Sequence, residues 1–137
     1  MKILIIDDLY ENRKILLDML VEYGECDIVS NGPDALTLFD EAHLDQTPYD
    51  LILLDIMMPS MDGQEVLRTI RGREKETGVA EEDEAAIIIV TALHSPMHML
   101  EAFFEGGCTS YIEKPFTKKN LFKKIREYQL RVQNWKG

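Results

Sequence analysis

The chain has few cysteines and no long hydrophobic run, and both absences narrow its class. Cys26 and Cys108 stand 82 positions apart among 137 residues, without the close spacing of a zinc or redox motif. We expect both thiols to be reduced and buried. No apolar stretch reaches the roughly 20 residues of a membrane span, and the N-terminus lacks the apolar region of a secretory signal. The sequence therefore predicts a cytoplasmic protein that does not enter a membrane.

Positive charge is also scarce, except near the C-terminus. The formal net charge is −10, which argues against direct nucleic-acid binding by this domain. Residues 118–137 hold seven lysines and arginines and one glutamate, a net charge of +6, so the remainder carries −16. We interpret this basic segment as a solvated helix face, and a docking face for an acidic partner is the alternative.

Strand-like aliphatic runs and amphipathic helix-like segments alternate along the chain. Strands are predicted at residues 2–6, 27–30, 51–54, 86–90 and 110–112, and helices at 11–23, from 31, at 64–77, from 95 to 106 and at 117–133. The polar stretch 74–84 reads as a surface loop, with an extra helical turn as the alternative. Five such units in series predict an α/β fold, a doubly wound five-stranded parallel sheet with helices on both faces. The length corresponds to one domain, residues 1–137.

Helical spacing of apolar residues predicts which side chains face the core. The expected buried residues are Ile15, Leu16, Met19 and Leu20 in the first helix, Leu36, Leu38 and Phe39 in the second, and Leu121, Phe122, Ile125, Tyr128 and Leu130 in the last. Ser95 and Thr117 stand where a helix N-cap is expected, and Pro33 stands in a favoured first-turn position.

Aspartates stand where the first and third predicted strands end. Asp7 and Asp8 follow the run 2–6, and Asp55 follows the run 51–54. Because ligands bind beyond the carboxyl ends of the strands in open parallel sheets, we expect the three carboxylates at one edge. Carboxylates that lie this close repel one another unless a cation joins them. Since Mg²⁺ prefers oxygen ligands, the sequence predicts a divalent-cation site there.

A hydroxyl and an ammonium are expected at the same edge. Thr91 and Ala92 follow the fourth predicted strand, and Lys114 follows the fifth. A carboxylate can act as a nucleophile toward phosphorus and form an aspartyl phosphate. The metal and the lysine would offset charge on the phosphoryl oxygens, and the threonine hydroxyl would donate a hydrogen bond to one of them. This combination predicts phosphoryl transfer at the edge of the sheet.

Five short motifs follow one another along nearly the whole chain. They are Ile5-Ile6-Asp7-Asp8, Leu53-Leu54-Asp55-Ile56-Met57-Met58-Pro59, Met61-Asp62-Gly63, Val90-Thr91-Ala92 and Tyr111-Ile112-Glu113-Lys114-Pro115-Phe116. Each is weak alone, but in this order and spacing they are highly specific. Together they resemble the response-regulator receiver domains of bacterial two-component signalling, chemotaxis regulators among them. The resemblance implies a flavodoxin-like fold with strand order 2-1-3-4-5.

The resemblance also implies how the metal and the phosphoryl group are held. Asp55 would be the phosphoacceptor. Asp8, Asp55 and the main-chain carbonyl of Met57 would bind Mg²⁺, with Asp7 assisting directly or through water. A phosphohydrolase with an aspartate nucleophile would want a second acid where Met57 stands. A flavodoxin would need a phosphate loop rich in Ser, Thr and Gly at residues 9–12, which the sequence does not provide.

Further roles follow from the same resemblance. Lys114 would pair with the phosphoacceptor or its phosphoryl group, and Thr91 and Ala92 would stabilise the phosphoryl oxygens. Thr91 would shift toward these oxygens, and Tyr111 would swing inward behind it as a second switch residue. From the residues alone, Tyr111 is equally well explained as a core aromatic. The Lys114–Pro115 peptide bond would be cis, a conformation mostly confined to proline.

The implied function is a phosphorylation-dependent switch rather than an ordinary enzyme, since the domain would catalyse only its own phosphoryl transfer and dephosphorylation. A sensor histidine kinase or a phosphotransfer protein would supply the phosphoryl group. The fourth helix, fifth strand and fifth helix would then change to control a downstream protein partner. Alternatives are a pseudo-receiver that acts without phosphorylation and the receiver part of a longer regulator. For a stand-alone receiver, a chemotaxis role and a phosphorelay role both remain open.

Overall fold

The computed structural model describes residues 1–92 and 107–127. Its strands are β1 (Lys2–Ile6), β2 (Glu25–Val29), β3 (Leu51–Leu54), β4 (Ala86–Thr91) and β5 (Ser110–Glu113). Its helices are α1 (Tyr10–Leu20), α2 (Gly32–Leu44), α3 (Gly63–Glu76) and α5 (Lys118–Glu127), with a short 3-10 helix η1 (Glu81–Asp83). The helix predicted from Ser95, and the predicted core residues Tyr128 and Leu130, lie outside the described residues.

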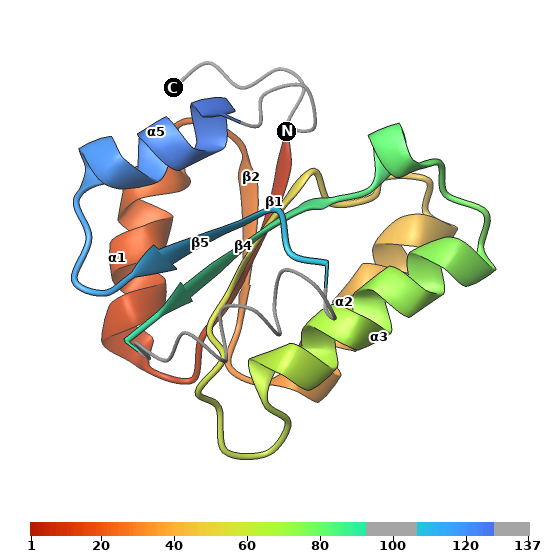
Figure 1. Cartoon of the computed structure of the whole chain (residues 1–137), viewed down its shortest axis with the longest axis horizontal. Helices are drawn as coiled ribbons and strands as arrows, with labels where there is room; N and C mark the ends of the chain where they lie inside the picture. Colours follow the sequence, from red (N-terminus) through yellow and green to blue (C-terminus); the bar gives the residue numbers. More distant parts are fainter. Residues whose placement is uncertain (93–106, 128–137) are drawn as a thin grey trace.

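All strand pairs are parallel, and the strand order is β2-β1-β3-β4-β5. Helices α1 and α5 cover one face of the sheet, and α2 and α3 cover the other (Figure 1). The predicted doubly wound, flavodoxin-like α/β fold is confirmed. In this topology the carboxyl ends of the strands point to the same edge of the sheet, which is where ligands bind.

Side chains of the central strands alternate between two cores. In β1, Ile3 and Ile5 pack on the side of α1 and α5, whereas Leu4 and Ile6 pack on the side of α2 and α3. Because both faces are covered, a central strand is a continuous aliphatic run. The predicted strands at residues 2–6 and 51–54 are therefore confirmed as β1 and β3 with the same bounds.

The first predicted helix and the second predicted strand need correction. Helix α1 ends at Leu20, three residues earlier than predicted. Leu16 and Leu20 are buried, but Ile15 is 48% exposed because it lies off the side of α1 that faces the sheet. Strand β2 begins at Glu25 rather than Asp27, since its pairing with β1 extends back to that residue.

In the stretch 74–84 the alternative prediction, an extra helical turn, is confirmed. Helix α3 ends at Glu76, one residue before the predicted end, and a single 3-10 turn, η1, follows. Glu74 is only 1% exposed. Its Oε1 accepts from Nη1 of Arg71 at 2.7 Å, and its Oε2 accepts from the Ala85 N–H at 2.8 Å. Arg71 also donates from Nε to the Gly107 carbonyl at 2.8 Å. These partners make burial of the charged pair possible.

Helix caps and cysteines largely follow the sequence. The Asn31 side chain accepts from the backbone of Asp34, and the Thr117 side chain accepts from the backbone of Asn120, as N-caps do. Both cysteines are free, with Cys108 buried and Cys26 half-buried. Among residues 1–92 and 107–127, no helix is long and apolar enough to span a membrane.

Candidate functional site

The three carboxylates meet beyond the carboxyl ends of β1 and β3. One oxygen each of Asp7, Asp8 and Asp55 lies within 4.8 Å of the others. Asp7 and Asp55 are 1% and 5% exposed, whereas Asp8 is only partly buried. We call these three residues the acidic triad. The triad is therefore anchored in the protein on one side and reaches solvent on the side of Asp8.

Lys114 joins two members of the acidic triad. Its Nζ donates to Oδ2 of Asp7 at 2.7 Å and to Oδ2 of Asp55 at 3.1 Å. The backbone N–H of Lys114 donates to the Thr91 carbonyl at 2.9 Å, and the peptide bond to Pro115 is cis. Three carboxylates and one ammonium leave a formal charge of −2 at this point. That charge and the oxygen-rich donor set fit a hard divalent cation such as Mg²⁺.

Asp7 has further partners at the start of α1, which sequence reasoning missed. Its Oδ1 accepts from the Leu9 N–H at 3.0 Å and from Nδ2 of Asn12 at 3.4 Å. Nη1 of Arg13 donates to the Asp7 carbonyl at 2.8 Å. The position of both side chains in the first turn after the aspartates is the signal that could have found them. Among the described residues, these contacts make Asp8 the least engaged member of the triad.

The loop after β3 positions Asp55. The Met57 N–H donates to Oδ1 of Asp55 at 3.0 Å, and the Gly63 N–H donates to the Ile56 carbonyl at 2.9 Å. Helix α3 begins so close to this strand end that a Cβ on Gly63 would lie 2.4 Å from the Asp55 carbonyl oxygen. Glycine is therefore required at this close approach. The Met61-Asp62-Gly63 motif thus places α3 against the phosphoacceptor predicted by the sequence.

Of the predicted switch residues, Thr91 ends β4, and Tyr111 lies within β5. Thr91 is fully buried, and Ala92 next to it is exposed. Tyr111 is 7% exposed and packs in the core on the side of α2 and α3. Burial raises the pKa of the Tyr111 hydroxyl, and the nearby Glu113 carboxylate raises it further. The structure thus describes an inward position of Tyr111.

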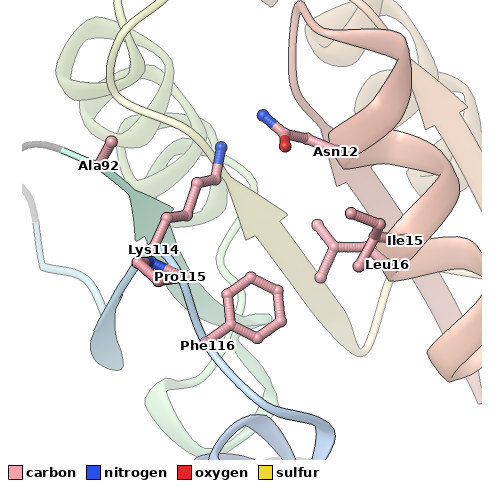
Figure 2. A pocket seen from close by; sticks show the side chains of 7 residues that line it. All are labelled: Asn12, Ile15, Leu16, Ala92, Lys114, Pro115 and Phe116. Carbon is pink, nitrogen blue, oxygen red and sulfur yellow. The ribbon is translucent and has the colours of Figure 1, made fainter.

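A pocket of about 340 Å³ opens beside Lys114. It is lined by Asn12, Ile15 and Leu16 of α1 and by Ala92, Lys114, Pro115 and Phe116 (Figure 2). In Figure 2 the ring of Phe116 lies across from Ile15 and Leu16, and the Lys114 ammonium points to the end of the pocket near Asn12. The pocket is thus a mainly apolar hollow with the site lysine at its border.

Comparison with known proteins identifies the family. Residues 3–126 match the response regulator receiver domain. The chain belongs to this family, whose members are signalling switches of two-component systems. Receiver domains bind Mg²⁺ at an acidic pocket, and the acidic triad is a cluster of carboxylates that could hold a metal ion.

Relatives and solved structures agree with this assignment. The chain is 38% identical over 128 residues to hybrid signal transduction histidine kinase L of Dictyostelium discoideum, covering 93% of this chain and 7% of that protein. It also superposes on one chain of the co-crystal structure of the Saccharomyces cerevisiae phosphotransfer protein Ypd1 and the Ssk1 receiver domain, with a TM-score of 0.80 and 28% sequence identity. The match covers 93% of this chain and 88% of that chain. The chemotaxis protein CheY4 of Vibrio cholerae superposes with a TM-score of 0.77 and 25% sequence identity, and the match covers 92% of this chain and 96% of that chain. The chain spans 7% to 50% of the length of the curated relatives compared.

Proposed function

We propose that residues 1–137 form one receiver domain that acts as a phosphorylation-dependent switch, with Asp55 as the phosphoacceptor. The observation that carries this proposal is the contact of one ammonium, Lys114, with two buried carboxylates beside the partly exposed Asp8. Such a site can hold a cation and a phosphoryl group together. The donor is the phosphohistidine of a sensor histidine kinase or of a phosphotransfer protein.

In this mechanism a carboxylate oxygen of Asp55 attacks phosphorus. The new oxygen–phosphorus bond forms as the nitrogen–phosphorus bond of the donor breaks, and the leaving imidazole nitrogen keeps the electron pair and takes up a proton from water. Asp8, Asp55 and the Met57 carbonyl would hold Mg²⁺, with Asp7 assisting, and the ion would offset charge on the phosphoryl oxygens. Lys114 then donates to a phosphoryl oxygen in place of its contact with Asp55.

The phosphoryl oxygens provide the signal. The Thr91 hydroxyl donates to one of them, with Ala92 beside it, and this contact stabilises the inward position of Tyr111. Phosphorylation adds charge and acceptor oxygens at one fixed point. Phosphorylation shifts the balance between two conformations of the domain only by the difference in its interaction free energy with each of them. The surface that responds includes β5 and α5, and a downstream protein reads it.

Exposed apolar residues beside the site support docking of a protein donor. Ile15 lies at the border of the pocket and is exposed, as are Leu9 and Tyr10 at the start of α1. Apolar side chains that are gathered in this way mark an interaction surface. The similar Ssk1 receiver was solved together with a phosphotransfer protein, as its description states. We place the donor over this pocket.

The test of the phosphoacceptor uses acetyl phosphate and Mg²⁺. The wild-type protein should gain one phosphoryl group that is labile to base and to hydroxylamine. Asp55→Asn should gain none, whereas Asp18→Asn, an exposed aspartate of α1, should behave as wild type. Intact-protein mass spectrometry measures the product. Uptake by Asp55→Asn at the wild-type level would overturn the proposal.

The donor surface has a separate test. Ile15→Asp should slow transfer from a phosphotransfer protein by about tenfold, because a charge replaces an apolar contact, while transfer from acetyl phosphate stays unchanged. Val21→Asp is the matched control, since Val21 is also exposed but lies after the C-terminal end of α1. Equal slowing with both donors would contradict docking at Ile15.

A further inference from the structure

A second pocket lies between the C-terminal halves of α2 and α3, which run side by side on one face of the sheet (Figure 1). Its volume is about 460 Å³. Its lining includes Phe39, Asp40, His43 and Leu44 of α2, Arg73 of α3 and Val79 after α3. Helix α3 begins beside Asp55, and Arg73 lies about 15 Å further along its axis. We call this hollow, which is separate from the phosphoryl site, the α2–α3 pocket.

On the side of α2, the wall of the pocket consists of two pairs of residues four positions apart. This spacing places side chains on the same side of a helix. The rings of Phe39 and His43 contact one another with their centroids 4.6 Å apart, and Asp40 and Leu44 form the second pair. Leu44 is 83% exposed, more than any other large apolar residue in the described part of the chain. A ligand that covers this side chain gains free energy from removing it from water.

On the side of α3, a glycine turn forms the wall. Gly78 has a φ of +75°, a conformation that favours glycine, and it follows the last turn of the helix. Its N–H donates to the Lys75 carbonyl at 3.1 Å, and the Val79 N–H donates to the Glu74 carbonyl at 2.9 Å. These bonds close the C-terminal end of α3 and place Val79 in the pocket lining with Arg73. Helix and turn hydrogen bonds thus hold the backbone of both walls in place.

One ion pair joins the two sides of the α2–α3 pocket. Nη1 of Arg73 donates to Oδ2 of Asp40. Within the described residues, this is the hydrogen bond that the two side chains make, so Oδ1 of Asp40 and Nε and Nη2 of Arg73 can still bind a ligand. The Asp40 and Arg73 side chains are 50% and 35% exposed, so a ligand can reach both. The pocket therefore presents a negative and a positive group side by side next to an apolar wall.

We propose that the α2–α3 pocket binds a free α-amino acid with a large apolar side chain. Such a molecule carries an ammonium and a carboxylate on one carbon. The ammonium pairs with Oδ1 of Asp40, and the carboxylate accepts from Nε and Nη2 of Arg73, a two-bond arrangement that guanidinium groups favour. The apolar side chain packs against Leu44 and Val79, and an aromatic one also meets the ring of His43.

Charge complementarity favours this ligand over others. A carboxylate without an ammonium would meet Asp40 in a chain with a net charge of −10, and an amine without a carboxylate would meet Arg73. The zwitterion is neutral overall and pairs with both groups. In a peptide the ammonium and the carboxylate lie at opposite ends, so one peptide cannot supply both here. The pocket also falls in the range of small-molecule sites, roughly 300–1,000 Å³.

The binding experiment follows the backbone amide shifts of the full chain by two-dimensional NMR as L-phenylalanine is added. The shifts should centre on residues 39–44 and 73–79, with a dissociation constant of about 1 mM. Phenylpropionate lacks the ammonium, and phenethylamine lacks the carboxylate. Each should bind about fivefold more weakly than L-phenylalanine, as expected when one hydrogen-bonded group is lost.

Substitutions assign each charge of the ligand to its partner. Arg73→Gln should weaken binding of L-phenylalanine about fivefold but should not weaken binding of phenethylamine, which has no carboxylate to lose. Asp40→Asn should likewise weaken binding of L-phenylalanine but not of phenylpropionate. Arg68→Gln and Asp18→Asn, exposed residues outside the pocket, are the matched controls and should bind as wild type.

Leu44→Ser tests the apolar wall. It should weaken binding of L-phenylalanine about fivefold, whereas Ile28→Ser, which changes an exposed apolar residue of β2, should leave it unchanged. Circular dichroism checks that all variants fold. Asp55→Asn should bind L-phenylalanine as wild type does, because the inference does not depend on the proposed function.

Four results would overturn the inference. L-phenylalanine could produce no saturable shifts at residues 39–44 and 73–79. Either single-charge probe could bind as tightly as L-phenylalanine. A control variant could lose as much affinity as the variant it is matched to. Finally, weaker binding by Asp55→Asn would place the ligand at the acidic triad instead of the α2–α3 pocket.

Discussion

The three carboxylates of the acidic triad differ in how many hydrogen-bond and charge partners they have. Lys114 contacts Asp7 and Asp55, and the start of α1 supplies Asp7 with further donors. Asp8 receives little of this help, since it is partly exposed and lies outside the hydrogen bonds described above. A cation that enters from solvent therefore meets Asp8 first, which makes this residue the most sensitive test of the metal site.

Asp8→Ala should lower the affinity for Mg²⁺ by at least about tenfold, as expected when a carboxylate ligand is lost, and should abolish phosphorylation by acetyl phosphate. The metal-free variant should be no less stable than wild type, because one repelling carboxylate is removed. Isothermal titration and urea unfolding measure the two effects. With Asp18→Ala as the control, an unchanged Mg²⁺ affinity in Asp8→Ala would remove the proposed metal site.

Cys108 gives the stability a dependence on alkaline pH. Burial raises the pKa of its thiol from 9.0 to about 12. Between these values the unfolded chain releases a proton that the native protein retains, so stability is full below pH 9 and falls as pH rises toward 12. Wild type should lose stability more steeply than Cys108→Ala, by up to about 1.4 kcal/mol per pH unit. Urea midpoints from pH 8 to pH 10.5 measure this, and parallel slopes would contradict it.

At the scale of elements, α3 contains two glycines whose replacement by alanine should change the stability in opposite directions. Gly63→Ala should destabilise the protein by about 1–3 kcal/mol, as overpacking does, and should slow phosphorylation because the new Cβ collides with the Asp55 carbonyl oxygen. Gly72 lies in the same helix with open space at its Cβ position. Gly72→Ala should therefore stabilise by about 0.5–1 kcal/mol at an unchanged phosphorylation rate. Similar effects of the two substitutions would contradict this account.

Strands whose bounds are determined mainly by burial were predictable from the sequence. Strands β1 and β3 are buried on both faces, so their aliphatic runs define their ends. Edge strand β2 is half-exposed, and its start depends on pairing with β1, which no local pattern reveals. Burial of Glu74 was missed for a similar reason. Arg71 is its neighbour on the same helix, but the Ala85 N–H reaches Glu74 only when the segment before β4 packs against α3.

The same contrast applies to the site. The carboxylates and Lys114 were predictable because strand ends in a parallel sheet converge on one edge. The contacts of Asn12 and Arg13 with Asp7 depend on where α1 begins and on the rotation of that helix. The exposure of Ile15 likewise depends on how α1 lies on the sheet. Sequence patterns locate such a helix to within a few residues but do not determine its rotation.

At the scale of the whole molecule, the proposed switch predicts that the conformational signal requires Thr91. Thr91→Ala should still be phosphorylated on Asp55, since the nucleophile, Lys114 and the acidic triad are intact. It should lose most of the conformational response around Tyr111, because the hydrogen bond that distinguishes the two states is absent. Amide exchange with and without beryllofluoride measures the response, with Thr37→Ala, an exposed threonine of α2, as the control. An equally large response in Thr91→Ala would rule out this coupling.

The strand order also has a consequence for biosynthesis. Because β1 pairs with both β2 and β3, the first 54 residues contain three adjacent strands, and β4 and β5 extend the sheet from one side only. Every carboxylate of the acidic triad is thus translated by residue 55, whereas Lys114 follows 59 positions later. Chains fold in part while they leave the ribosome. During that interval the three carboxylates lack their ammonium partner, and water and cations from solution screen their charge.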